Sequence, residues 1–154
     1  MVRFAGMLTQ EAVQCSQSLK TWATALERGD EQLTVIFGTK GGRPRQTRVL
    51  DREALTQTVN QALAVAATHN GRLIDKPDLK SAINRWRSQT AMAGLKGQYS
   101  PHSLRYAWAQ DAMHYYRQQG FSNREARSLV SMDLGHGDGR GRYVERVYCG
   151  CNAI

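Results

Sequence analysis

The sequence is poor in cysteine and has no long hydrophobic run. Only three of its 154 residues are cysteines, Cys15, Cys149 and Cys151. An odd number without a framework spacing argues against a disulfide-stabilised secreted domain and favours a reducing compartment. No apolar run approaches the ~20 residues that span a bilayer, and the N-terminus lacks the apolar core of a signal peptide. We therefore expect a cytoplasmic protein without a membrane contact.

Acidic residues are scarce relative to basic ones. The chain has 21 lysines and arginines against 13 aspartates and glutamates, a formal net charge of +8. Such an excess favours a polyanionic partner, of which nucleic acid is the commonest. A basic protein that is merely well solvated has nearly the same composition, so charge alone leaves these two interpretations about even. The length suits a single domain, taken here as 1–154, with a real hydrophobic core.

Hydrophobic periodicity predicts a mainly helical α+β domain with one small antiparallel sheet. Segments rich in β-branched residues predict strands at 33–37 and 47–50. The glycine-rich segment 38–45 between them is a turn by composition, so the two strands form a hairpin with a basic tip. Apolar residues at helical spacing predict helices over about 4–28, 52–68, 78–94, 101–119, 122–135 and 143–148.

Local signals predict where several helices begin, what they bury and where they end. Asp51 and Ser100 are expected N-caps, and Ser122 with Glu125 has the spacing of a capping box. Asn70-Gly71 is expected to end the helix over 52–68. The apolar stripes are expected to face the core through Leu55, Val59, Leu63, Ala66, Leu79, Ile83, Trp86, Ala126, Leu129 and Val130.

Several polar residues are candidates for chemistry. A cationic hairpin is usually a solvated turn, but the density of charge here suggests a finger that contacts phosphate; its members are Lys40, Arg43, Arg45 and Arg48. His102 and Arg105 share one face at the start of a helix and could meet one anion, although spacing alone favours separate surface roles.

The remaining candidates also have ordinary structural interpretations. His136, at a helix end, would by itself more often be a capping or packed histidine. Tyr143 and Tyr148 would by themselves more often be packing residues. The combination and order of these residues along the chain are more specific than any one of them.

In that order, these segments resemble the catalytic domain of the tyrosine recombinase, or phage integrase, family. The matching pieces are the hairpin Thr39-Lys40-Gly41-Gly42-Arg43-Pro44-Arg45, the box His102-Ser103-Leu104-Arg105-Tyr106, Leu134-Gly135-His136 and a downstream tyrosine. The hairpin is most similar to that of a bacterial integrase subgroup. The resemblance implies the family's helical catalytic fold and site-specific recombination of double-stranded DNA through a 3′-phosphotyrosyl intermediate. It also implies tetramers on paired DNA, and neither a metal nor a nucleotide cofactor.

The resemblance further implies a role for each matching residue. Lys40 would protonate the leaving 5′-hydroxyl, and Tyr148 would be the nucleophile. Arg105 would be the second of two arginines that grip the non-bridging oxygens, since a guanidinium fork matches two phosphate oxygens. His102 would assist proton transfer and hold the phosphate, and His136 would donate a hydrogen bond to it. The other hairpin arginines would contact DNA.

The chain departs from the family pattern in three places. The best alignment with the family's Gly-Leu-Arg-x-x-Glu-Ala helix is 6–12, which puts Leu8 at the arginine position and leaves Arg3 as a poorly spaced substitute. Loss of such a donor commonly lowers the rate ~10²–10³-fold. The interval from His136 to Tyr148 is longer than usual, so Tyr143 competes as nucleophile. There is no room for the family's N-terminal clamp domain, so we expect an N-terminally truncated catalytic domain.

Two other functions stay open at this stage. Leu8 and the missing clamp domain suggest a catalytically impaired DNA-binding remnant. A metal protein would use the side chains of His102, His136, Cys149 and Cys151, but their spacings match no closed metal site.

Overall fold

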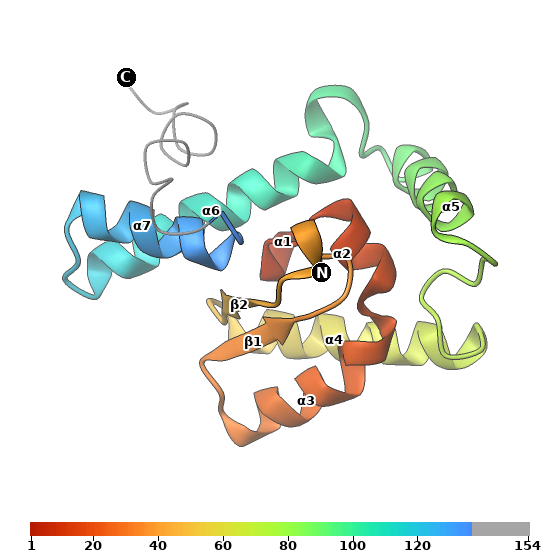
Figure 1. Ribbon diagram of the computed structural model, residues 1–154, viewed down its shortest axis with the longest axis horizontal. Coiled ribbons are helices and arrows are strands. Elements are labelled where there is room, and N and C mark those ends of the chain that lie inside the picture. Colours follow the sequence, from red (N-terminus) through yellow and green to blue (C-terminus); the bar gives the residue numbers. More distant parts are fainter. Residues whose placement is uncertain (137–154) are drawn as a thin grey trace.

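The first 28 residues form a broken series of short helices in the computed structural model, which describes residues 1–136 (Figure 1). They comprise α1 (Val2–Ala5), α2 (Thr9–Gln14), the 3-10 turn η1 (Cys15–Ser18) and α3 (Leu19–Arg28). The predicted continuous helix over 4–28 is wrong because Gly6 adopts a left-handed conformation with φ 59°. A Cβ at Gly6 would lie 2.7 Å from the Trp108 ring, so glycine lets the chain turn directly against that side chain.

The predicted hairpin is confirmed, with shifted strand ends. β1 (Gln32–Val35) pairs antiparallel with β2 (Arg45–Arg48), and Val35 lies opposite Arg45. β2 begins two residues before the predicted strand at 47–50, because Arg45 and Gln46 already pair with Val35 and Thr34 of β1. The connection contains the 3-10 turn η2 (Lys40–Gly42).

The next two helices agree with the sequence to different degrees. α4 (Arg52–Thr68) has the predicted bounds, and its N-cap Asp51 accepts a hydrogen bond from the Ala54 N–H at 3.0 Å. α5 (Leu79–Met92) ends two residues early, and Ala82 is the one residue of this helix that is buried. The prediction that Leu79 faces inward is wrong: it is 37% exposed.

α6 (Pro101–Gln118) follows the 3-10 turn η3 (Gly97–Tyr99) and is joined by a short turn to α7 (Asn123–Asp133). The capping box of Ser122 and Glu125 is confirmed. Ser100 precedes α6 but its side chain caps nothing; instead the Ser103 hydroxyl donates to the Ser100 carbonyl at 2.6 Å. The predicted loop and helix after His136, with Tyr143, Tyr148, Cys149 and Cys151, lie outside the described residues.

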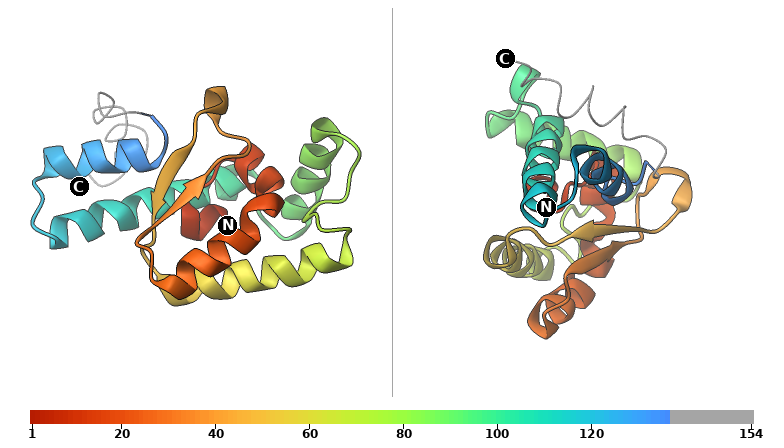
Figure 2. Two further views of the ribbon diagram at one scale, coloured as in Figure 1. Left: turned by 60° about the horizontal axis from the view of Figure 1, so that its bottom comes forward. Right: turned by 90° about the vertical axis from the view of Figure 1, so that its left-hand side faces the viewer.

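The hairpin lies between two hydrophobic clusters. The first cluster is formed by the helices from α1 through α4 together with β1, and it includes Trp22, Leu33 and Leu55. The second is formed by α6 and α7 and includes Trp108 and Val130. β2 packs against α7, and α1 packs against α6, as the views in Figure 2 show. Within residues 1–136, no helix combines the length and apolar character needed to cross a bilayer.

Candidate functional site

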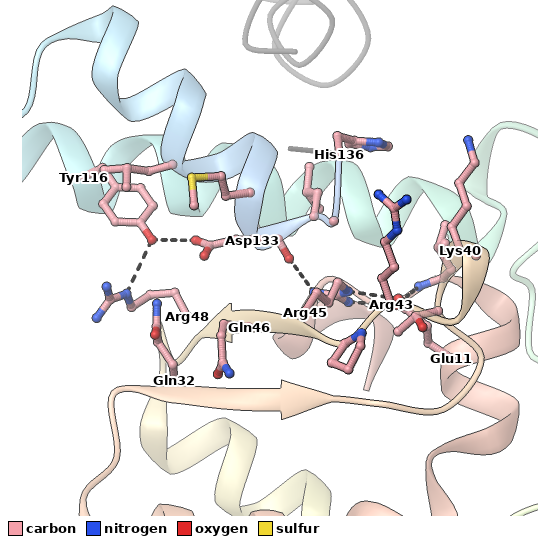
Figure 3. A pocket seen from close by; sticks show the side chains of 18 residues that line it. Glu11, Gln32, Lys40, Arg43, Arg45, Gln46, Arg48, Tyr116, Asp133 and His136 are labelled. Carbon is pink, nitrogen blue, oxygen red and sulfur yellow. Dashed lines mark hydrogen bonds and ion pairs between the residues drawn. The ribbon is translucent and has the colours of Figure 1, made fainter. Parts of the chain in front are cut away.

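A cleft of about 760 Å³ opens between the hairpin, α2 and the end of α7 (Figure 3). Basic side chains outnumber acidic ones along it. The basic lining residues are Lys40, Arg43, Arg45, Arg48 and His136, and the acidic ones are Glu11 and Asp133. This excess of basic side chains suits an anionic ligand, because a positively charged cleft raises the local concentration of anions.

A buried ion pair forms one wall of the cleft. The Arg45 guanidinium binds Glu11 through two bonds, Nε to Oε1 at 2.9 Å and Nη2 to Oε2 at 2.7 Å. The Arg45 and Glu11 side chains are only 5% and 1% exposed. Glu11 also accepts the Leu8 N–H at 2.8 Å, which begins α2. A buried pair of charges persists only where such additional hydrogen bonds satisfy it.

Two buried arginines join the segments that the sequence singled out. Arg45 and Arg105 both donate to the Gly6 carbonyl, at 3.2 Å and 2.5 Å. Each also donates to a carbonyl at the end of α7, Arg45 to Asp133 at 2.5 Å and Arg105 to Leu134 at 2.6 Å. The Gly6 carbonyl is therefore the point at which these two arginines connect four segments: the hairpin, α6, the α1–α2 bend and the α7 terminus. We call Glu11, Arg45, Arg105 and Gly6 the buried frame.

The structure brings some predicted site residues together and leaves others apart. Lys40 and Arg43 are exposed at the hairpin tip, and His136 follows α7; all three line the cleft. Arg105 does not line it and is 0% exposed. Tyr148 lies outside the described residues.

His102 also does not line the cleft, although it precedes Arg105 by one helical turn. It is exposed near the start of α6, where its ring meets that of Tyr106 edge-on at 5.0 Å. Partial burial lowers the pKa of His102, and the positive charge of Arg105 lowers it further. The neutral imidazole is therefore favoured.

Comparison with known proteins identifies the family. The model of the family described as Integrase matches residues 1–111. The chain belongs to the integrase family of tyrosine recombinases. This membership gives it an integrase role in DNA recombination, with DNA as its partner. No curated protein and no solved structure matched the chain.

The alignment proposed from the sequence puts Leu8, an apolar residue, at the position of a family arginine. Leu8 lines the cleft, next to Glu11. The poorly spaced substitute, Arg3, pairs instead with Asp111 at 2.7 Å and does not line the cleft. The phosphate-binding capacity of this wall therefore cannot come from residue 8.

A second polar network lies at the other end of the cleft. The Tyr116 hydroxyl donates to Asp133 Oδ2 at 2.5 Å, and Arg48 Nε donates to the Tyr116 oxygen at 3.4 Å. Burial raises the pKa of Asp133 to about 6, against the opposing effects of the Tyr116 hydrogen bond and the charges of Arg48 and Arg45. Burial, and then the Asp133 carboxylate, raise the pKa of Tyr116.

Sequence reasoning missed the structural importance of Glu11, Tyr116 and Asp133. Glu11 had a signal, since it stands in the segment that aligns with the family's Glu-Ala pair. Asp133 and Tyr116 had none, because a Tyr–Asp bond between α6 and α7 leaves no local pattern. Among residues 1–136, no group of three His, Cys, Asp or Glu side chains is arranged to hold a metal ion.

Proposed function

We propose that this integrase breaks and rejoins duplex DNA in site-specific recombination, through a 3′-phosphotyrosyl intermediate formed at the cleft. The observation that carries the proposal is the meeting of Lys40 and His136, far apart in the sequence, along one basic cleft. An ammonium from the hairpin and an imidazole from the end of α7 can bind one phosphodiester together (Figure 3).

In the cleavage step the phenolic oxygen of Tyr148 attacks phosphorus, and the bond from phosphorus to the 5′-oxygen breaks. Lys40 gives its proton to that oxygen, which leaves as a 5′-hydroxyl. The phenolic proton passes to a base. The neutral imidazole favoured at His102 suits this role chemically, but His102 does not line the cleft, so α6 would have to bring it to the phosphate when DNA binds. The phosphotyrosyl ester conserves the bond energy, so the reverse reaction rejoins the strand without a cofactor.

His136 donates a hydrogen bond to a non-bridging oxygen. Arg105 is fully buried and does not line the cleft. It would bind the same phosphate only after the α7 terminus or the Gly6 bend moves and one of its carbonyl acceptors, at Gly6 or Leu134, is exchanged for a charged oxygen, which is the stronger acceptor. Arg45 keeps the buried frame in place, while Arg43 and Arg48 contact the DNA backbone. The active assembly is a tetramer on paired DNA.

A library of nicked duplexes with random sequence tests the proposal without knowledge of the target site. Incubation with the integrase, followed by denaturation, retains only DNA that is covalently attached. We expect an adduct whose peptide map contains Tyr148, and no adduct with Tyr148→Phe. Tyr143→Phe is the matched control and is expected to react like the parent.

Three outcomes would contradict the proposal. An adduct mapped to Tyr143 would reassign the nucleophile. An adduct that persists in both phenylalanine variants would remove the phosphotyrosyl mechanism. Retention of DNA under native conditions, with no adduct at all, would leave a DNA-binding remnant disabled at Leu8.

A further inference from the structure

We propose that Arg43 supplies the phosphate-binding guanidinium that Leu8 cannot. The inference rests on the proposed function, because it assigns a further catalytic residue to the same cleft. It would make the hairpin tip the source of both a proton donor, Lys40, and an oxyanion ligand. The positive charge that the family pattern has at residue 8 would then be supplied from residue 43 instead of being lost.

The other guanidiniums near the cleft are already bound to protein acceptors. Arg45 makes its two bonds to Glu11, and Arg105 donates to two carbonyls. Arg48 pairs with Glu31 at 3.1 Å and donates to Tyr116. Each would have to give up a protein acceptor in order to bind a phosphate oxygen.

Arg43 differs from these three arginines. It lines the cleft and is exposed, and within residues 1–136 the structure gives its side chain no hydrogen bond or ion pair. Its guanidinium can therefore take a phosphate oxygen without breaking any interaction among those residues. Arginine suits this task because its planar fork can donate two parallel bonds.

The Arg43 side chain leaves the hairpin toward the cleft. Arg43 is extended, with φ −85° and ψ 124°, and it precedes Arg45 by two residues. Side chains two apart in an extended chain emerge on the same side. Since Arg45 points inward to Glu11, Arg43 emerges on that side too, but beyond the strand and over the open cleft. Figure 3 shows its guanidinium and the Lys40 ammonium rising from the hairpin on the side where His136 lies.

The backbone of the hairpin tip is preorganised. Gly41 and Gly42 adopt left-handed conformations, with φ 69° and 70°, and the Gly42 N–H donates to the Thr39 carbonyl at 3.1 Å. Pro44 restricts the backbone immediately after Arg43. A turn held in this way fixes where Lys40 and Arg43 leave the chain, so less entropy is lost when they bind an anion.

A rescue experiment tests the assignment. Rates of adduct formation are measured at saturating DNA for the parent, Arg43→Ala, Leu8→Arg and the double variant. We expect Arg43→Ala to lower the rate constant ~10²-fold, as for loss of one oxyanion donor, and the double variant to recover most of that loss. Arg85→Ala, which removes an exposed arginine from α5, is the matched control and should leave the rate unchanged.

A second readout separates this inference from the proposed function. Inorganic phosphate is titrated into each variant while the arginine Nε–H signals are followed by NMR. We expect Arg43→Ala to weaken phosphate binding roughly tenfold, the effect of losing about 1.4 kcal/mol, and Leu8→Arg to restore it. That result without any adduct would refute strand cleavage and keep the anion site. Unchanged phosphate affinity in Arg43→Ala, a parental cleavage rate, or failure of Leu8→Arg to rescue would overturn the role of Arg43.

Discussion

Arg43 and Arg45 stand two residues apart on one hairpin, but their surroundings are opposite. Arg45 belongs to the buried frame, where Glu11 and two backbone carbonyls take up its donors. Arg43 belongs to the exposed tip, where no other residue among 1–136 binds its side chain. The difference shows that arginines of the same hairpin have separate roles: Arg45 stabilises the fold, and Arg43, within residues 1–136, is free to bind a ligand. Burial and pairing, and not residue type, separate the two.

The largest effect is expected from Glu11→Gln, which keeps the shape of the frame and removes its negative charge. Arg45 would then be a buried cation without a counter-ion, and breaking such a pair costs about 3–5 kcal/mol. Urea denaturation should show this loss in the free energy of unfolding. Lys40→Ala at the tip is the control and should change it little; a loss below ~1 kcal/mol in Glu11→Gln would show that the frame is not a stability element.

A glycine pair makes the same comparison for the backbone. Gly6→Ala combines a left-handed φ with a Cβ only 2.7 Å from the Trp108 ring, whereas a Cβ at Gly41 meets nothing within 4 Å. Overpacking costs about 1–3 kcal/mol and the left-handed conformation about 1–2 kcal/mol. Thermal denaturation should therefore show a loss of about 2–5 kcal/mol for Gly6→Ala and about 1–2 kcal/mol for Gly41→Ala. Equal losses would remove the role of the close contact with α6.

The pH dependence of stability tests the buried end of the cleft. Burial raises the pKa of Asp133 to about 6, while an unfolded aspartate titrates near 3.9. Between these values the folded chain holds a proton that the unfolded chain has released, so the stability due to that proton is complete below pH ~4 and is lost as pH rises through 6.

Asp133→Asn should abolish this dependence. From about pH 4 to pH 8 the parent should lose roughly 2 kcal/mol relative to the variant, which corresponds to its raised pKa. Chemical denaturation at a series of pH values measures the difference. Parallel curves for the two proteins would mean that Asp133 does not titrate in this range. Glu125→Gln, at an exposed capping box, is a control that leaves the dependence near pH 6 in place.

The smallest effect on stability is expected from Arg43→Ala. Surface substitutions without a protein partner usually change the free energy of unfolding by no more than ~0.5 kcal/mol. The same change should lower the salt dependence of duplex DNA binding by about 0.9 in the slope of log affinity against log salt, the value for one phosphate contact. An unchanged slope would place this guanidinium away from the DNA backbone.

Much of the fold could be predicted because its signals are local. Asp51 as N-cap, an apolar stripe and Asn70-Gly71 delimit α4 at its observed bounds. Ser122 and Glu125 mark the start of α7 in the same way. The hairpin was recognisable from β-branched residues on both sides of a glycine-rich turn. The break at Gly6 was not, because its cause is the Trp108 ring on α6.

The sequence by itself determined the helical character, the hairpin, the basic charge and the order of motifs that marks an integrase. These depend on capping, periodicity and composition within a few residues. Only the tertiary structure decided that Arg45 and Arg105 are buried around Gly6, that Arg43 stays exposed, and that Leu8 faces the same cleft as His136. A guanidinium takes its role from the acceptors that surround it, and here those acceptors come from segments far apart along the chain.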